Sequence, residues 1–187
     1  MTESTDRPTP THVTLELGTL EHLRDQLRER GQRPSIAFGP QTSTDLLEAI
    51  HIVEEYGAMC EAMYLMMAVD NRVVNAEREV LRGALDVLSS GRVRTVHMEA
   101  MLDSAARKIA HDGAKKRLAK VIEALKDDPA RAEATVILAA AVAAADSRIV
   151  PEEHALLNEL FLGLGIDQVR ADEILGAIDG KLAAKGV

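Results

Sequence analysis

Hydrophobic residues recur at a spacing of three or four along most of the chain, and no stretch shows sustained alternation of polar and apolar residues. The first spacing places apolar side chains on one face of a helix, whereas alternation would indicate a strand. Helices are predicted over residues 19–31, 43–70, 75–89, 95–112, 114–126, 129–146, 151–163 and from 167 onward. The fold class that this pattern predicts is all-α.

Capping residues mark several of the predicted helix ends. Asp128 and Pro129 form an N-cap and first-turn pair, and Asp167 caps the last helix. The chain before residue 44 is polar and contains several prolines and glycines, apart from one amphipathic helix that we expect to dock on the bundle or on a partner. We therefore expect residues 1–43 to form a flexible N-terminal tail with one short helix. Residues 44–187 are expected to form a single compact helical bundle.

Two of the predicted helices are apolar on nearly every side. They contain the segments MCEAMYLMMAV, at residues 59–69, and TVILAAAVAAA, at residues 135–145. A helix without a polar stripe is surrounded by other helices, and alanine lets a neighbouring helix come close. We expect these two segments to pack against each other at the centre of the bundle.

A short motif follows each apolar helix, and its two copies are alike. Residues 67–81 read MAVDNRVVNAEREVL, and residues 143–157 read AAADSRIVPEEHALL. The identical pairs, all at one separation and without a gap, are Ala68 and Ala144, Asp70 and Asp146, Arg72 and Arg148, Val74 and Val150, Glu77 and Glu153, and Leu81 and Leu157. The repetition predicts an internal pseudo-two-fold, in which a helix, a short turn and a second helix occur twice.

The repeated acidic residues flank the turn in each copy. Asp70 and Asp146 close the two central helices, and Glu77 and Glu153 lie in the first turn of the helices that follow. Because Pro151 opens its helix, Glu153 is the third helical residue, where a carboxylate suits the helix dipole and can reach back to the N-cap amide. Valine caps poorly at the N-cap position, so the two aspartates are expected to brace the turns.

The step from Asp through a turn and an Ile or Val to a Glu in a new helix resembles the signature of the TerB-like family. This family includes the tellurite-resistance TerB proteins and the N-terminal domain of some DnaJ-type membrane co-chaperones. The resemblance covers residues 44–180. It implies a compact bundle of about seven helices with pseudo-symmetry, association with membrane-linked stress-response complexes, and no enzymatic activity.

The resemblance also implies a candidate metal site. The family's clustered acidic positions correspond to Asp70, Glu77, Asp146 and Glu153 in this chain. In the family such residues are proposed to bind a divalent metal, and a hard cation such as calcium or magnesium takes several oxygen ligands at once. The residue after each Asp is Asn or Ser here, where the family usually has Gly. Two interpretations stay open: the four acids bind a divalent cation, or they only brace the two turns.

Composition limits the remaining possibilities. A net charge of −8 argues against nucleic acid as the main partner. A single cysteine, Cys60, excludes an internal disulfide and fits a reducing compartment. The start of the chain lacks a signal-peptide layout, and its most apolar run is too short to cross a bilayer. The expected location is the cytoplasm, including a peripheral position at the inner face of the membrane.

Four other patterns in the sequence are of the kinds that functional sites use. A basic cluster could meet an anionic membrane surface or an acidic partner, or could be a solvated face; it comprises Arg107, Lys108, Lys115, Lys116, Arg117 and Lys120, with Asp112 among them. The stripe of Met59, Met63 and Met66 is typical of core filling rather than of a soft-metal site. The Glu48-x-x-His51 motif lacks the second copy that a di-iron bundle needs. Cys60 has no base at a spacing that would activate a nucleophile.

Two functional hypotheses follow. In the first, the chain is a non-enzymatic TerB-like stress-response protein whose acidic cluster binds a divalent cation. In the second, it is a helical protein–protein interaction adaptor, and the acidic turns are purely structural. Both hypotheses expect a protein partner, including a membrane-associated one, and neither fixes the oligomeric state.

Overall fold

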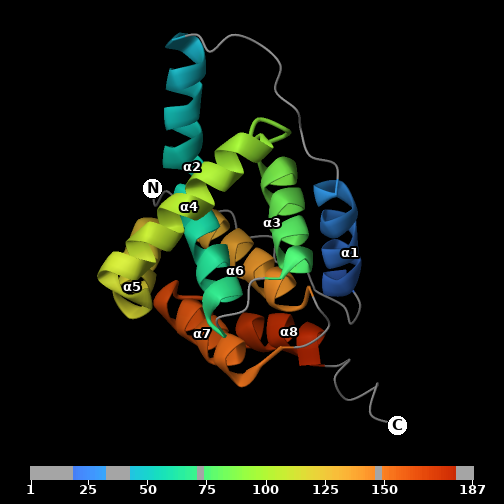
Figure 1. The fold of residues 1–187 in the computed structure, drawn as a ribbon. Helices are drawn as coiled ribbons and strands as arrows, with labels where there is room; N and C mark the ends of the chain where they lie inside the picture. Colours follow the sequence, from blue (N-terminus) through green and yellow to red (C-terminus); the bar gives the residue numbers. More distant parts are fainter. Residues whose placement is uncertain (1–18, 33–42, 71–73, 146–148, 180–187) are drawn as a thin grey trace, which may run out of the picture.

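The computed structural model describes residues 19–32, 43–70, 74–145 and 149–179. These residues form eight helices and no strand, which confirms the predicted all-α class (Figure 1). The helices are α1 (Thr19–Gly31), α2 (Ser43–Ala68), α3 (Asn75–Leu88), α4 (Thr95–Asp112), α5 (Ala114–Leu125), α6 (Pro129–Ala143), α7 (Pro151–Gly163) and α8 (Gln168–Asp179). The bundle that follows the N-terminal segment therefore contains the seven helices α2 to α8.

Local capping determines where several helices begin. The Asp128 carboxylate accepts a hydrogen bond from the Arg131 amide at 3.1 Å, and Pro129 occupies the first helical position of α6. The Asp167 carboxylate accepts from the Arg170 amide at 3.0 Å at the start of α8. Each bond satisfies an amide that has no partner within its own helix. Both caps were predicted from the sequence and are confirmed.

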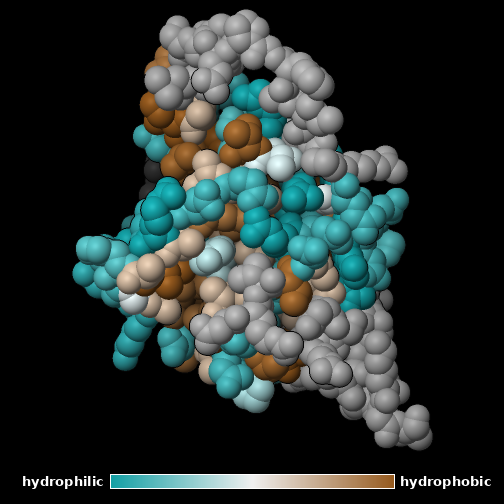
Figure 2. All heavy atoms as spheres, viewed as in Figure 1, coloured by the Kyte–Doolittle hydropathy of each residue, from teal (hydrophilic) through white to brown (hydrophobic). Residues whose placement is uncertain are grey.

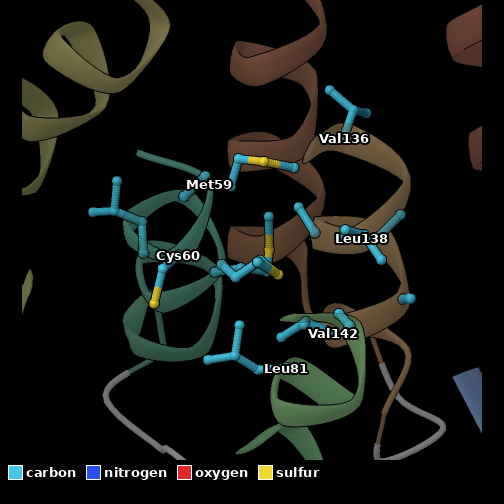
Figure 3. Close-up of a cluster of buried hydrophobic side chains, with 14 of the residues drawn as sticks. Met59, Cys60, Leu81, Val136, Leu138 and Val142 are labelled. Atoms are coloured by element: carbon cyan, nitrogen blue, oxygen red, sulfur yellow. The ribbon is translucent and has the colours of Figure 1, made fainter. Parts of the chain in front are cut away.

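The packing of α2 against α6 forms the centre of the core. From residue 135 to residue 143 every side chain of α6 is buried except the partly buried Ile137. The α2 methionines at 59, 63, 66 and 67 are buried as well, and the two helices are in contact. Figure 3 shows the cluster with Met59 and Cys60 from α2, Leu81 from α3, and Val136, Leu138 and Val142 from α6. The predicted contact between the two apolar segments is therefore confirmed.

Each central helix continues into a hairpin with the helix that follows it. Helix α2 packs against α3, and α6 packs against α7. The hairpins also contact each other crosswise, because α3 lies against α6 and α7 lies against α2. These are the contacts that a duplicated hairpin requires. The two-fold rotation that would relate the copies stays a prediction.

Helix α1 docks on α3 through an unusually close backbone approach. A Cβ atom added at Gly83 of α3 would overlap the Leu27 carbonyl of α1, and one added at Gly31 would overlap the Glu79 carbonyl. Arg82 of α3 donates a hydrogen bond to the Gly31 carbonyl of α1 at 2.6 Å. The Leu27 side chain of α1 is buried. The amphipathic helix of the N-terminal segment thus lies on its own bundle. The remainder of the predicted tail, residues 1–18 and 33–42, lies outside the described residues.

We predict that Gly83→Ala destabilises the protein, because the added methyl group must push α1 away from α3. Overpacking of this kind costs about 1–3 kcal/mol. Gly57→Ala is the matched control: it is also inside a helix, and its Cβ would meet only the Val53 side chain at 3.7 Å among the described residues. That substitution should leave stability unchanged or raise it by up to about 1 kcal/mol.

Thermal melting, with amide exchange of residues 19–31, measures both effects. Equal melting temperatures for Gly83→Ala and the wild type would show that α1 is not held through this contact.

Candidate functional site

The two glutamates of the repeated motif cap their helices in the same way. Glu77 Oε2 accepts a hydrogen bond from the Val74 amide at 3.0 Å, and Glu153 Oε2 accepts from the Val150 amide at 2.9 Å. Both valines occupy the N-cap position with an extended backbone, and a valine side chain has no acceptor of its own. The glutamate at the third helical position therefore reaches back to the N-cap amide, as predicted for Glu153.

Both capping carboxylates are buried. Glu77 is 5% exposed and Glu153 is 4% exposed, although each belongs to the first turn after a loop. A negative charge at this position is favoured by the partial positive charge of the helix N-terminus. Burial and the amide hydrogen bond fix each carboxylate in one place. The repeat thus preserves two equivalent buried acids, one for each hairpin.

Only one of the two aspartates of the motif lies within the described residues. Asp70 lies half-buried just after the end of α2, and Asp146 lies outside the described residues. Within the described parts of the chain, no three His, Cys, Asp or Glu side chains gather as a group that could hold a metal ion. Asp70, Glu77 and Glu153 therefore do not suffice for the metal site by themselves. Any such site would need Asp146 as well.

A second charged cluster contains a glutamate that sequence reasoning missed. Glu61 lies within the apolar segment of α2 and is 4% exposed. The Arg117 guanidinium of α5 donates to both of its carboxylate oxygens, at 2.6 and 2.9 Å, and the Lys108 ammonium of α4 lies 3.5 Å away. A lone charge in an otherwise apolar helix must find a partner, because burying it unpaired costs several kcal/mol. That rule could have predicted from the sequence that Glu61 has a cationic partner, but not which cation it is.

Asp112 extends this cluster to the surface at the end of α4. Its carboxylate pairs with Lys120 at 3.0 Å, with Arg117 at 3.2 Å and with Lys116 at 3.4 Å. Hydrogen bonds from Lys120, His111 and Arg117 hold the pKa of Asp112 well below its ordinary value. Arg117 thus joins the buried Glu61 to Asp112. We call the set Glu61, Lys108, Asp112, Arg117 and Lys120 the α4–α5 charge cluster.

The cationic side chains around this cluster form an exposed basic face. The exposed members, on the last turns of α4 and on α5, are Arg107, Lys108, Lys115, Lys116 and Lys120. Arg117 is partly buried beside them, with a side chain 12% exposed. The basic cluster found in the sequence is therefore divided: one arginine joins the helices together, and the other cations face solvent.

The other sequence candidates occupy ordinary positions. Met59, Met63 and Met66 lie in the hydrophobic core, where methionine fills irregular gaps. Burial raises the pKa of the Cys60 thiol to about 12, so it stays protonated and weakly nucleophilic at neutral pH. Glu48 and His51 are exposed on α2, and His51 instead lies 3.7 Å from Glu54.

These features define an all-α protein in which two hairpins with buried capping glutamates pack around an apolar centre. The family model for tellurite resistance protein TerB matches residues 57–175, from within α2 to within α8. The match covers more than half of the chain, and the chain belongs to the TerB family. No curated protein and no solved structure matches it. Among the helices that the structure describes, none combines the length and the apolar character needed to cross a membrane.

We predict that Asp112→Asn removes part of the acid sensitivity of folding. The folded pKa of Asp112 is depressed, so its stabilising effect is complete above the unfolded value of about 3.9 and is lost as the pH falls below it. The melting temperature of the wild type should exceed that of Asp112→Asn by a margin that is constant above about pH 5 and shrinks below about pH 4.

Asp103→Asn is the control, since Asp103 is an exposed acid on the same helix. Its margin should be small at every pH. A margin for Asp112→Asn that does not change between neutral and acidic pH would contradict the assignment.

Proposed function

We propose that this TerB-family chain is a non-enzymatic stress-response protein that acts by binding a partner protein through the basic face of α4 and α5. The observation that carries the proposal is the α4–α5 charge cluster, which holds the surface cations around two anchored carboxylates. The family is generally non-enzymatic, and its tellurite-resistance description supports a role in stress response. The proposed location is the cytoplasm, and the partner can be one attached to the inner face of the membrane.

The basic face is preorganised for an anionic ligand. The Asp112 carboxylate forms ion pairs with Lys116 and Lys120, and the Glu61 carboxylate forms one with Lys108, at distances of 3.0–3.5 Å. Ordering long side chains in advance lowers the entropy that is lost when a ligand binds. Arg107 and Lys115 lie exposed beside them and can contact the ligand directly. The face therefore offers several cations on two packed helices.

An acidic protein segment fits this face better than a membrane does. The chain carries a net charge of −8, so a broad anionic surface would repel most of the molecule while attracting only this one face. A short acidic segment can reach the basic face without approaching the remaining surface. Electrostatic complementarity of this kind increases the association rate and selects the partner.

We predict that a fluorescent peptide rich in Asp and Glu binds the full chain, and that binding weakens as salt rises, because exposed ion pairs are screened. Arg107→Glu combined with Lys115→Glu should reduce the affinity about tenfold or more. Lys126→Glu is the matched control, since it reverses an exposed lysine just after α5, outside the basic face. Fluorescence anisotropy measures the three affinities.

Equal affinity for the wild type and the double variant would exclude this face. Binding to vesicles that contain anionic lipid, with none to the peptide, would favour the membrane instead.

A second candidate function is divalent-cation binding by Asp70, Glu77, Asp146 and Glu153. It is favoured by one observation, the pair of equivalent buried carboxylates at Glu77 and Glu153. Calcium or magnesium is the expected ion, because all the donors are carboxylate oxygens. The capping hydrogen bonds give the same glutamates a structural role, which is why this function ranks second.

The two roles of Glu153 predict different melting behaviour. Glu153→Gln keeps an oxygen that can accept the Val150 amide but removes the charge, whereas Glu153→Ala loses the cap at a cost of about 1 kcal/mol. If a cation binds, saturation at about 100 times its dissociation constant should stabilise the wild type by about 2.7 kcal/mol. Glu153→Gln and Asp146→Asn should lose that gain.

The measurement is thermal melting in chelator and then in calcium or magnesium, with the exposed neighbour Glu152→Gln as the control that keeps the gain. Identical wild-type melting in both conditions would leave the acids as turn and cap residues only.

A further inference from the structure

The first half of α2 stands away from the rest of the bundle, as Figure 1 shows. Between residues 47 and 55 only Ile52 is buried, whereas nearly all of residues 56–67 lie in the core. Tyr56 marks the change, since its hydroxyl donates to the Leu88 carbonyl at 3.3 Å. About two and a half turns of helix are therefore held to the bundle through one side only.

The opposite side of this half-helix is apolar and exposed. Leu47 is 61% exposed, Ile50 is 45% exposed and Val53 is 51% exposed. A spacing of three residues keeps them in one stripe, about 9 Å long, on the side of the helix turned away from Ile52 and Tyr56. Figure 2 shows hydrophobic side chains gathered over this projecting part of α2. We call Leu47, Ile50 and Val53 the α2 stripe.

The acidic residue beside the stripe is Glu54. It is exposed on the same side of α2 as Leu47 and Ile50, and the helix contains no Lys or Arg. His51 lies 3.7 Å from Glu54 and is the one basic side chain of this half-helix. The neighbouring Glu55 already pairs with Arg92 at 3.1 Å. The edge of the stripe at Glu54 is therefore acidic.

We propose that the α2 stripe binds an amphipathic helix of a partner protein that carries Lys or Arg along one edge. Apolar side chains at helical spacing would pack on Leu47, Ile50 and Val53, and the basic edge would meet Glu54. Gly57 continues the line of the stripe, and its missing side chain lets a second backbone come close. This surface lies on a different helix from the basic face and does not depend on it.

A second copy of the chain fits the stripe less well. Pairing two α2 helices through the stripe would bring Glu54 of both copies into one contact, with no Lys or Arg in either helix to offset them. Like charges at such a contact oppose association. The same acidic edge attracts a basic helix. Charge complementarity thus selects a basic partner helix as the occupant.

The test uses a fluorescent synthetic helix with leucines at i, i+3, i+4 and i+7 and lysines along one edge. Its binding to the full chain is measured by fluorescence anisotropy at about 0.15 M salt, where exposed charges are partly screened. A second peptide carries glutamates in place of the lysines. The lysine peptide should bind saturably, and the glutamate peptide should bind at least about tenfold more weakly.

Variants locate the binding surface. Ile50→Gln and Glu54→Lys should each weaken binding of the lysine peptide about tenfold. Leu162→Gln replaces another exposed apolar residue, 75% exposed on α7, and Glu152→Lys makes the same charge change at an exposed position of α7. Both controls should bind as the wild type does. All the changed side chains are exposed, and melting temperatures within a few degrees of the wild type would show that folding is intact.

Three outcomes would overturn the proposal. Equal binding by the wild type and Ile50→Gln would place the peptide elsewhere. Equal binding of the two peptides would remove the charge argument. A dimer in sedimentation velocity that Ile50→Gln abolishes would make a second copy the occupant. The Arg107→Glu and Lys115→Glu double variant should still bind the lysine peptide, so failure of the basic-face proposal can be told apart from failure of this one.

Discussion

The close packing of α2 against α6 is the constraint on which the rest of the structure depends. Small alanine side chains on α6 allow the helices to approach, and the methionines of α2 fill the irregular space that remains. Neither helix has a polar stripe over the packed length. The other helices must therefore cover both of them, and every polar group drawn into this region needs a partner.

The positions of the charged residues follow from that constraint. Glu61 enters the core on α2, and Arg117 must reach it from α5. Glu77 and Glu153 are buried beside the turns that leave the central helices, where they accept hydrogen bonds from the N-cap amides of Val74 and Val150. The exposed basic face and the acidic margin of the α2 stripe are what remains on the surface. Internal pairing thus leaves two surfaces of opposite charge available to partners.

Local physics made most of the fold predictable. Helical periodicity predicted the all-α class. The starts of α6 and α8 were predictable from Asp128, Pro129 and Asp167, because a cap depends on neighbouring residues alone. The capping role of Glu153 was predictable for the same reason. The partner of Glu61 was not, since Arg117 is distant in sequence and several cations near it were equally plausible. For this reason the sequence did not predict that Arg117 links the surface charge cluster to the buried Glu61.

By itself, the sequence determined the helices, their caps and the two apolar segments that had to meet, because periodicity and capping act over a few residues. Only the tertiary structure decided which cation meets Glu61 and that α1 rests on α3 through Gly31 and Gly83. It also decided that one side of the first half of α2 stays uncovered. Exposure depends on where distant helices end, and no spacing pattern within a single helix records that.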